Sequence, residues 1–357
     1  MKNKIIVVSS YPERSKTHGE KTVGVASYTK NLLMNLKGFD FEVIAEVHTK
    51  KERYEEQEIH INRLWKRNSI ATLLKMTNYV AKSQIMTVVI PIEFYMFGGL
   101  IQNMIFLYSL LVWKLSGKKI ILILHQVLAK LFFLYWPLIF LSEKTVVFEE
   151  KFRKALGNKK VVFIPHAVEK VTLKVPKQEK TFSALYFGYL SPYKGIKELI
   201  DLWDKNYGEL IIAGGGNPNH MKNKRYSNFI KGIKATGFVP ENIISDYFLN
   251  TDLVILPYKM FFSSSGPLSL AFSYEKPFIL SRPLIGYFDS PDFAETLKET
   301  GLRKEDFLFD FNKNSFEFRL NWAKKNLDKL AAFSRIMKEK RAWNKIAKQY
   351  EKLLKEI

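Results

Sequence analysis

The feature that most constrains the fold is a repeated alternation of short apolar runs with longer amphipathic segments. In the first half of the chain, the apolar runs predict strands at 5–9, 42–46, 87–91, 119–124, 144–148 and 160–164. The segments between them predict helices at 23–36, 70–82, 100–115, 127–140 and 150–156. Strands that alternate with helices in this way indicate a parallel sheet covered by helices on both faces.

The alternation stops at a charged stretch, EKVTLKVPKQEK, and then starts again. The second half predicts strands at 184–187, 210–213, 233–236, 253–256 and 278–280, helices at 196–203, 243–249 and 268–274, and a helical end at 316–357. We therefore expect two doubly wound domains with a ligand-binding cleft between them. The expected bounds are 1–168 for the first domain, 169–180 for the linker, 181–335 for the second domain, and 336–357 for a C-terminal helix that packs back toward the first domain.

Charge and composition limit the partners. Lys and Arg number 56 against 35 Asp and Glu in 357 residues, a formal net charge of +21. A field of that sign favours nucleic acid, acidic lipid headgroups or phosphorylated substrates, although a merely lysine-rich surface is the alternative. Cysteine is absent, which excludes disulfides and thiolate sites. The apolar run near the start is shorter than that of a secretory signal, so we expect a cytoplasmic protein.

Several common site signatures are missing. The sequence has no G-x-G-x-x-G fingerprint, no Walker P-loop and no pair of Asp residues two apart, and its six His show no metal-ligand spacing. We therefore expect neither a metal nor a cofactor. None of the standard nucleic-acid-binding motifs is present either, so nucleic acid is not expected as a partner.

The stretch LYFGYLSPYKGIKELI at 185–200 combines a strand, a turn and a helix. Its apolar run ends at Gly188, and Lys194 lies in the turn before the helical pattern. Ligands of open α/β sheets bind at such turns, beyond the carboxyl ends of the strands. A lysine near a helix N-terminus suits a phosphate group.

Three positions in the first half have a similar setting. Gly24 opens a helix after a long loop, and a glycine there allows backbone to approach a ligand closely. Glu93 and His125 each follow an apolar strand. The Glu93 carboxylate could accept a hydrogen bond from a sugar hydroxyl, and the His125 imidazole could bond a sugar hydroxyl or a phosphate. The alternatives are a simple loop glycine and a histidine satisfied at the edge of the core.

The second half has a further cluster in IAGGGN, TGFVP and SSSGPLS. The serines and Gly266 come directly before a helix, whose free N–H groups can bind an anion. Ser264 or Ser265 as a plain helix cap is the alternative, and both roles can coexist.

Six segments, taken in order, resemble the GT-B glycosyltransferases of family 4, in a subgroup with SSG in place of the usual glutamate motif. They are VVSSYPER…VGVASYTKNLLMNL, IEFYMFGG, ILILHQV, FIPHAV, FGYLSPYKGIKELI and SSGPLSLAFSYEKP. The resemblance covers most of the chain. It implies the GT-B architecture, in which two Rossmann-like doubly wound parallel-sheet domains face each other across a cleft. The acceptor side would be the first domain, and the donor nucleotide would lie mainly on the second.

The resemblance also implies an activity. A retaining, metal-independent glycosyltransferase would move a hexose from a nucleotide-diphosphate sugar to a saccharide or lipid-linked acceptor, without a cofactor. Lys194 would neutralise the leaving diphosphate, His125 would contact the donor sugar, and Gly24 would let the first loop approach the phosphates. We predict Lys194, His125 and Glu93 as catalytic residues. The predicted donor-binding residues are Gly24, Gly188, Lys194, Gly214, Gly215, Phe238, Val239, Ser264, Ser265 and Gly266.

The sequence departs from family 4 at a few positions. Aligned without gaps, its two usual glutamates fall on Phe262 and Leu270, and Glu275 stands where glycine is usual. Tyr189 stands in place of an arginine, so Lys194 is expected to carry more of the charge compensation. The missing glutamates motivate an alternative function, a catalytically degenerate GT-B binding or scaffold subunit.

Two segments, 97–115 and 127–141, are almost wholly apolar. Gln102 and Asn103 interrupt the first, and the second is too short to span a membrane. Three interpretations stay open, namely helices buried against the sheet, helices that dip into one leaflet and, least favoured, a membrane span. Nearby lysines and arginines suit peripheral contact with an anionic membrane on its cytoplasmic face.

Overall fold

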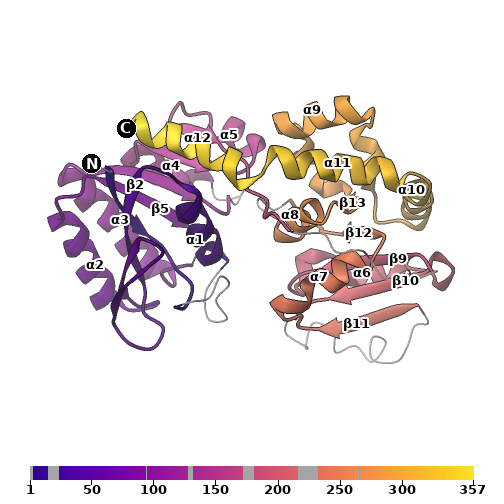
Figure 1. Ribbon diagram of the computed structural model, residues 1–357, viewed down its shortest axis with the longest axis horizontal. Coiled ribbons are helices and arrows are strands. Elements are labelled where there is room, and N and C mark those ends of the chain that lie inside the picture. The colour runs from indigo at the N-terminus through magenta and orange to yellow at the C-terminus, as the bar shows by residue number, and fades with distance from the viewer. Residues whose placement is uncertain are drawn as a thin grey trace. The chain divides into compact units, whose positions relative to one another are not determined.

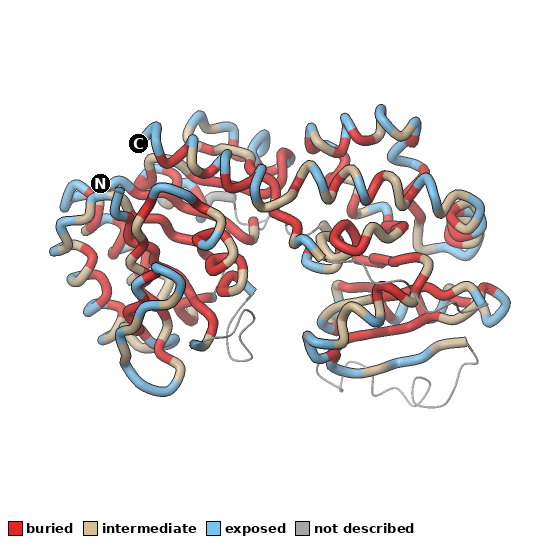
Figure 2. Tube along the Cα trace, in the orientation of Figure 1, coloured by how far each residue is buried: buried red, intermediate tan, exposed pale blue. Residues whose placement is uncertain are grey.

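The computed structural model describes residues 3–14, 24–93, 95–127, 132–171, 181–215, 232–261, 263 and 265–357, apart from the side chains of Phe132, Phe133 and Glu241. The chain divides into unit 1, which is Met1–Pro165 with Trp343–Ile357, and unit 2, which is His166–Ala342. Each unit has its own sheet, with buried strands at its centre (Figures 1 and 2). The expected segment 336–357 is thus divided at Trp343. Residues 172–180 of the expected linker lie outside the described residues, and the domain bounds remain a prediction.

Unit 1 contains an eight-stranded sheet in the order β3-β4-β2-β1-β5-β6-β7-β8, parallel except for β3. Its strands are β1 (Asn3–Val8), β2 (Phe39–Glu46), β3 (Arg53–Glu56), β4 (Ile59–Trp65), β5 (Thr87–Ile92), β6 (Lys119–Leu124), β7 (Lys144–Val147) and β8 (Val161–Phe163). Its helices are α1 (Val25–Asn35), α2 (Ile70–Lys82), α3 (Leu100–Leu115), α4 (Phe132–Leu141), α5 (Glu150–Leu156) and α12 (Trp343–Lys355).

The crossover connections determine which face of this sheet each helix covers. The connections through α2, α3 and α4 all run in the same direction along the strand order, whereas the connection from β1 to β2 through α1 runs in the opposite direction. Because crossovers between parallel strands are right-handed, α2, α3 and α4 share one face and α1 lies on the other. Contacts of α3 with both α2 and α4 agree with this layer.

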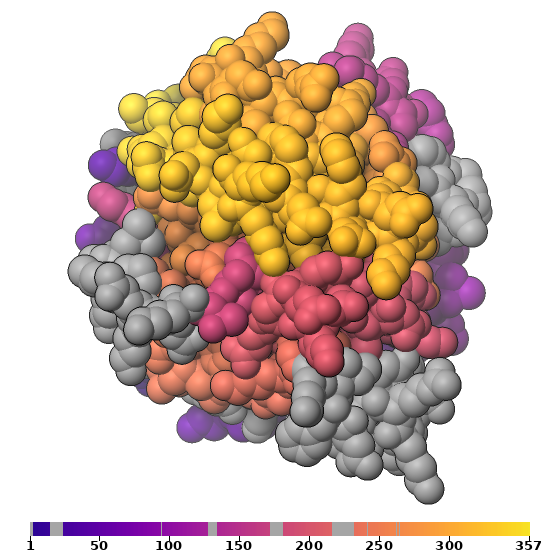
Figure 3. Space-filling model, turned by 90° about the vertical axis from the view of Figure 1, so that its right-hand side faces the viewer, coloured from indigo at the N-terminus to yellow at the C-terminus, as the bar shows by residue number. Residues whose placement is uncertain are grey.

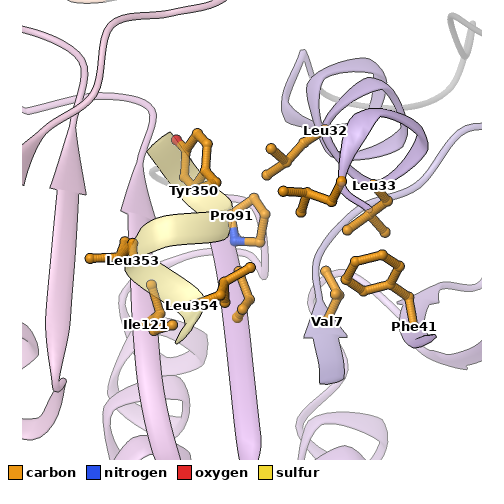
Figure 4. Close-up of a pocket in the computed structure, with 11 residues that line it drawn as sticks. Val7, Leu32, Leu33, Phe41, Pro91, Ile121, Tyr350, Leu353 and Leu354 are labelled. Carbon is orange, nitrogen blue, oxygen red and sulfur yellow. The ribbon is translucent and has the colours of Figure 1, made fainter. Parts of the chain in front are cut away.

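The last helix of the chain packs beside the first one. In unit 1, α12 contacts α1, and the Tyr28 and Tyr350 hydroxyls are hydrogen-bonded at 2.9 Å in a buried setting. Apolar side chains of α1, α12 and the strands β1, β5 and β6 surround a small apolar cavity between them (Figure 4). Leu353 of α12 is one of the residues that line this cavity and is 5% exposed. The amphipathic pattern of the C-terminal segment therefore completes the core of unit 1.

We expect Leu353→Ala to destabilise unit 1 by about 2–4 kcal/mol, because it removes buried methyl groups next to a space that is already poorly filled. Lys352→Ala, on the exposed face of the same helix, should change the free energy of unfolding by less than about 0.5 kcal/mol. Urea unfolding followed by circular dichroism measures both. Equal midpoints for the two variants would contradict the packing of α12 described here.

Unit 2 contains a six-stranded parallel sheet in the order β11-β10-β9-β12-β13-β14. Its strands are β9 (Ser183–Phe187), β10 (Glu209–Ala213), β11 (Ile233–Gly237), β12 (Leu253–Leu256), β13 (Phe278–Ser281) and β14 (Leu308–Phe309). Its α-helices are α6 (Ile196–Leu202), α7 (Ile244–Leu249), α8 (Gly266–Ser273), α9 (Pro291–Thr300), α10 (Lys313–Lys325) and α11 (Leu327–Lys340). Short 3-10 helices include η2 (Pro192–Lys194) and η3 (Lys205–Tyr207).

The helical end of unit 2 covers its sheet. The gold surface of α10 and α11 adjoins the segment from β9 to η3 in Figure 3, and the contacts agree with this view. Lys324 Nζ donates to the Tyr207 carbonyl at 2.6 Å, and the Trp203 and Phe316 rings lie 6.2 Å apart. A large aromatic cluster, with Phe293 and Phe333 at its centre, fills the space between α9, α11 and the strands.

The sequence predictions miss one adjacent pair of strands in unit 1. Neither β3 nor β4 was expected, because IHINRLW places polar residues among its apolar ones. The structure shows why they are tolerated. Arg63 is 2% exposed, and its guanidinium donates to the Glu46 carbonyl at 2.9 Å and to the Tyr54 hydroxyl at 2.8 Å.

The two apolar segments form α3 and α4, and the structure places them in part at the surface. On α3, Phe106, Leu110 and Trp113 are buried, whereas Leu100 and Leu115 are 78% and 79% exposed. Within the residues that the structure describes, no helix is both long enough and apolar enough to cross a membrane.

Candidate functional site

The strand order of unit 2 defines a switch point between β9 and β12. The chain runs outward from β9 through β10 to β11, then returns to the other side of β9 and runs outward through β12, β13 and β14. In open α/β sheets, ligands bind at such a point, beyond the carboxyl ends of the two central strands. Lys194 follows β9, and Tyr258 follows β12, so both belong to this location.

A tight turn holds Lys194 there. Lys194 ends η2, and Gly195 adopts a left-handed conformation with φ of 66°. A Cβ at Gly195 would lie 1.8 Å from the Pro257 carbonyl oxygen, so only glycine fits between the turn and the segment after β12. The Lys259 N–H donates to the Tyr193 carbonyl at 2.8 Å and ties the same two segments together.

Lys194 is buried, and no carboxylate of the described residues is its partner. Lys194 is only 8% exposed, and its Nζ donates a hydrogen bond to the Tyr258 hydroxyl at 2.6 Å. Among the described residues, no acidic group forms an ion pair with it, and burial lowers its pKa from 10.5 to about 7. Burial also raises the pKa of Tyr258, which remains a neutral phenol. The site therefore favours an anion that would restore the full charge of Lys194.

The helix α8 begins at the same place. Ser265 is its N-cap, and Ser265 Oγ accepts from the Leu268 N–H at 3.4 Å and lies 3.3 Å from the Tyr258 hydroxyl. Pro267 has no N–H, so Gly266 is the residue in the first turn whose N–H no described group accepts. Ser264 lies outside the described residues. Ser265 is thus a structural cap, and it also links α8 to Lys194 through Tyr258.

The predicted glycines meet at the neighbouring strand ends. A Cβ on Gly214, after β10, would lie 1.9 Å from the Gly188 carbonyl oxygen, and one on Gly215 would lie 3.1 Å from Phe238 Cβ. The Leu190 N–H donates to the Gly215 carbonyl at 2.9 Å. Phe238 is 76% exposed beside them. The structure thus brings Gly188, Gly214, Gly215 and Phe238 together at one edge of the sheet.

Val239 and Tyr189 also lie at these strand ends. Val239 is buried, whereas Tyr189, which directly follows Gly188, is 65% exposed. The Tyr186 hydroxyl donates to the Tyr189 carbonyl at 3.1 Å, which fixes the backbone of that turn and leaves the Tyr189 ring in the solvent. Exposed rings at Tyr189 and Phe238 offer flat surfaces on which a planar group could stack.

Unit 1 has its own switch point, between β1 and β5, and Glu93 lies there. Glu93 follows β5, and Gln126 Nε2 donates to Glu93 Oε1 at 3.3 Å. Burial raises the pKa of Glu93, and the charge of Arg67 partly opposes that rise. Glu46, at the end of β2, has its pKa raised by burial in the same way and accepts from the Ser10 hydroxyl at 3.1 Å.

The surroundings of His125 and Gly24 give less support for a role in ligand binding. The His125 N–H donates to the Ile92 carbonyl at 3.0 Å, so His125 is next to Glu93 along this edge. The His125 ring is buried edge-on against Tyr28 and Phe148, at 4.6 and 4.9 Å between ring centroids. Gly24 has an ordinary right-handed backbone, and a Cβ there would meet nothing within 4 Å. The proposed roles of both residues remain predictions.

Some residues at these edges were not predicted from the sequence. They are Tyr258 and Tyr193 in unit 2, and Glu46, Arg67 and Gln126 in unit 1. Tyr258 directly follows the apolar run DLVILP, which was the available signal. Within the part of the chain that the structure describes, no group of three His, Asp or Glu side chains has an arrangement suited to a metal ion.

Comparison with known proteins identifies the fold. No protein-family model and no curated protein sequence matches this chain. Among solved structures, the sucrose-phosphate synthase of Thermosynechococcus elongatus matches with a TM-score of 0.70 and 14% identity, over 99% of this chain and 98% of that chain. Anabaena HepE in complex with UDP and glucose matches with a TM-score of 0.67 and 12% identity, over 99% of this chain and 100% of that chain.

A glycosyltransferase from Rickettsia africae is similar as well, with a TM-score of 0.66 and 14% identity over 99% of this chain and 98% of that chain. Likeness over nearly the full length of both chains shows that this chain has the fold of these proteins, the GT-B architecture of two Rossmann-like units with parallel sheets. The expected fold class is confirmed. The cleft between the two domains and membership of family 4 remain predictions.

Proposed function

We propose that the protein is a glycosyltransferase that moves a hexose from a nucleotide-diphosphate sugar to an acceptor, with the donor diphosphate at Lys194. The observation that carries this proposal is the buried lysine at the switch point of unit 2, which has no carboxylate partner among the residues that the structure describes. An anion that binds there gains both the charge of Lys194 and the N-terminus of α8. The exposed ring of Phe238, beside the glycines that close these strand ends, would provide a flat surface for a nucleoside base.

The chemistry of this transfer needs such a cation. Cleavage of the bond between the anomeric carbon and the diphosphate oxygen leaves negative charge on the diphosphate and a cationic sugar. A positive charge already placed at the leaving group lowers that barrier, because it requires no reorganisation during the reaction. We infer that Lys194 takes this role without a metal. Transfer with retention at the anomeric carbon is part of the proposal and is supported by the sequence resemblance to family 4.

The comparisons support the donor class. The HepE structures contain UDP, UDP with glucose, or UDP-glucose, and they share the fold of this chain. We propose that a nucleoside diphosphate binds here at the corresponding edge of unit 2, near Gly188, Gly214 and Gly215. No cofactor is needed, since the diphosphate itself is the leaving group.

We propose that unit 1 provides the acceptor side. Glu93 has a raised pKa and could exchange a hydrogen bond with a sugar hydroxyl, and His125 lies on the neighbouring strand end. The acceptor would be a saccharide or a lipid-linked sugar. A lipid-linked acceptor would bring a cytoplasmic protein into peripheral contact with the cytoplasmic face of a membrane, where anionic lipids attract its net positive charge.

A thermal-shift screen with UDP, GDP, ADP and their sugar conjugates tests the donor proposal. A nucleotide at 100 times its dissociation constant should stabilise the native state by about 2.7 kcal/mol. Radiolabelled sugar from the stabilising nucleotide should then be transferred or hydrolysed. Binding without any turnover would favour the degenerate subunit that the missing glutamates suggest. Absence of both binding and turnover would contradict the glycosyltransferase proposal.

A further inference from the structure

Large apolar side chains at the surface are concentrated on one layer of unit 1. Among the described residues, eighteen large hydrophobic side chains are exposed, and eleven of these belong to α2, α3 and α4. Isolated exposed apolar residues are normal, but a contiguous group marks a surface that meets an apolar partner. Because the three helices share one face of the sheet, their exposed side chains point away from it in the same direction.

The stripe on α3 is the main part of this surface. Its exposed members are Leu100, Ile101, Met104, Tyr108, Leu111 and Leu115. From Ile101 onward they recur at intervals of three and four residues, which places them along one side of the helix. Phe106 and Trp113 anchor the opposite side in the core. The helix therefore lies flat on the sheet and exposes its apolar side along its whole length.

Both neighbouring helices extend the stripe. On α2, Ile70 and Leu74 are each 43% exposed, and on α4, Trp136 and Phe140 are 49% and 78% exposed. We call the exposed apolar residues of α2, α3 and α4 the apolar face. A tryptophan at its edge suits the boundary between water and hydrocarbon, where amphipathic rings are preferred.

The charges around the apolar face are mostly positive, and the one carboxylate directly after α4, Glu143, is paired with Lys114 of α3. Residues 59–142, which include all three helices, contain nine Lys or Arg but one acidic residue, Glu93. The rest of the chain has 47 basic and 34 acidic residues, so the excess of basic over acidic residues, relative to length, is higher in residues 59–142. The Arg67 guanidinium donates to the Tyr95 carbonyl at 2.8 Å near the start of α3, and Lys160 Nζ donates to the Phe140 carbonyl at 3.0 Å at the end of α4.

We propose that the apolar face is a docking surface for an anionic lipid bilayer, with α3 lying in the plane of the interface. This inference rests on the proposed peripheral membrane contact and identifies the residues that form that contact. Basic side chains around an apolar helix face match negative headgroups over acyl chains. Two copies of the face would bring like charges together, so charge complementarity selects the bilayer over a second copy of this chain.

Vesicle co-sedimentation tests the proposal. The full chain is mixed with vesicles of phosphatidylcholine alone or with 30% phosphatidylglycerol. The variant Met104→Glu plus Leu115→Glu adds two charges to the apolar face at exposed positions. The control Met34→Glu plus Phe318→Glu adds the same two charges at exposed positions elsewhere, on α1 and α10. Thermal midpoints check that both variants fold.

We expect the parent and the control to bind the anionic vesicles alike and the face variant to bind at least about tenfold more weakly. Binding of the parent to neutral vesicles should also be weaker, and high salt should reduce anionic binding. Equal binding by the two variants would overturn the docking surface and leave the membrane contact standing. A parent that binds no vesicle would overturn both.

Two further measurements separate this proposal from others. Stabilisation by a nucleotide sugar should be the same in the face variant and the control, since the proposed donor site belongs to unit 2. Failure of nucleotide binding in every form would count against glycosyl transfer and not against docking. Light scattering reports the oligomeric state. A parent dimer that the face variant converts to a monomer, with vesicle binding unchanged, would show that the face is a self-association interface and overturn the proposal.

Discussion

Replacement of Lys194 by Met is expected to reduce sugar transfer at least about 100-fold while leaving the fold intact or more stable. The loss follows because the proposed leaving diphosphate would have no buried cation to stabilise it, and removal of one such preorganised group typically costs 100- to 1000-fold in rate. Met retains much of the apolar volume of the lysine stem. Tyr258 would keep its contact with Ser265, so its hydroxyl would not become isolated.

The difference in stability between this variant and the parent should depend on pH in a defined direction. The pKa of Lys194 is about 7 in the folded chain and 10.5 in the unfolded chain, so the unfolded state binds more protons between these values. Stability of the parent should therefore rise with pH across this window as the burial penalty is lost. At about 1.4 kcal/mol per pKa unit, that penalty is on the order of 5 kcal/mol below pH 7. The stability advantage of Lys194→Met should be largest there and shrink toward pH 10.

The matched control is Lys197→Met, three residues further along and exposed on α6. It removes the same charge from the chain, so any effect of net charge alone would appear in both variants. Transfer assays under nucleotide-sugar saturation, together with denaturant unfolding at pH 6 and pH 9, measure the two expectations. Unchanged transfer in Lys194→Met would contradict the proposed role, and a large loss of stability at pH 6 would show that Lys194 is a structural residue.

Replacement of Gly195 by Ala is expected to destabilise unit 2 by about 4 kcal/mol or more. The added Cβ would lie 1.8 Å from the Pro257 carbonyl oxygen, in a left-handed backbone that alanine already disfavours. Backbone on both sides must then move, and an effect of that size is exceptional for a single substitution. Because the same turn holds Lys194, we also expect the loss of nucleotide binding in the fraction that folds.

Gly301→Ala is the control that has the conformational strain of a left-handed alanine but no steric clash. Gly301 has the same φ of 66°, but a Cβ there would meet nothing within 4 Å. Gly301→Ala should lower the free energy of unfolding only by the cost of the left-handed conformation, about 1–2 kcal/mol. Urea midpoints for the two variants give the comparison. A Gly195→Ala midpoint no lower than that of Gly301→Ala would mean that the turn and the segment after β12 are not packed as described.

The elements best predicted from the sequence are those whose pattern is contained within one short segment. The strands β1, β5 and β6 are apolar runs because helices cover both faces of a parallel sheet, and an apolar run needs no partner to be recognised. The strand β4 was missed because Asn62 and Arg63 are buried within it. The burial of Arg63 depends on the Glu46 carbonyl and the Tyr54 hydroxyl, which other strands supply and which a single segment does not reveal.

In the candidate site, too, a residue with a local sequence pattern was predicted and one that depends on a distant contact was not. Lys194 was found because its turn carries a local pattern, whereas Tyr258 was not, although it accepts the Lys194 hydrogen bond. The two residues are 64 positions apart, and they meet only because β9 and β12 are neighbours in the sheet. Strand order results from the packing of the whole unit. The low pKa of Lys194 likewise arises from burial and could not be inferred from its sequence neighbours.

The position of α12 has a consequence for the synthesis of the chain. Unit 1 takes its last helix from the C-terminus, after all of unit 2 has been made. While a ribosome is still translating unit 2, the side of α1 that carries Leu32 and Leu33 has no covering helix. The first unit to emerge is thus the last to be completed. Loss of the 15 residues Trp343–Ile357 would uncover the core of unit 1, which the first part of the chain builds.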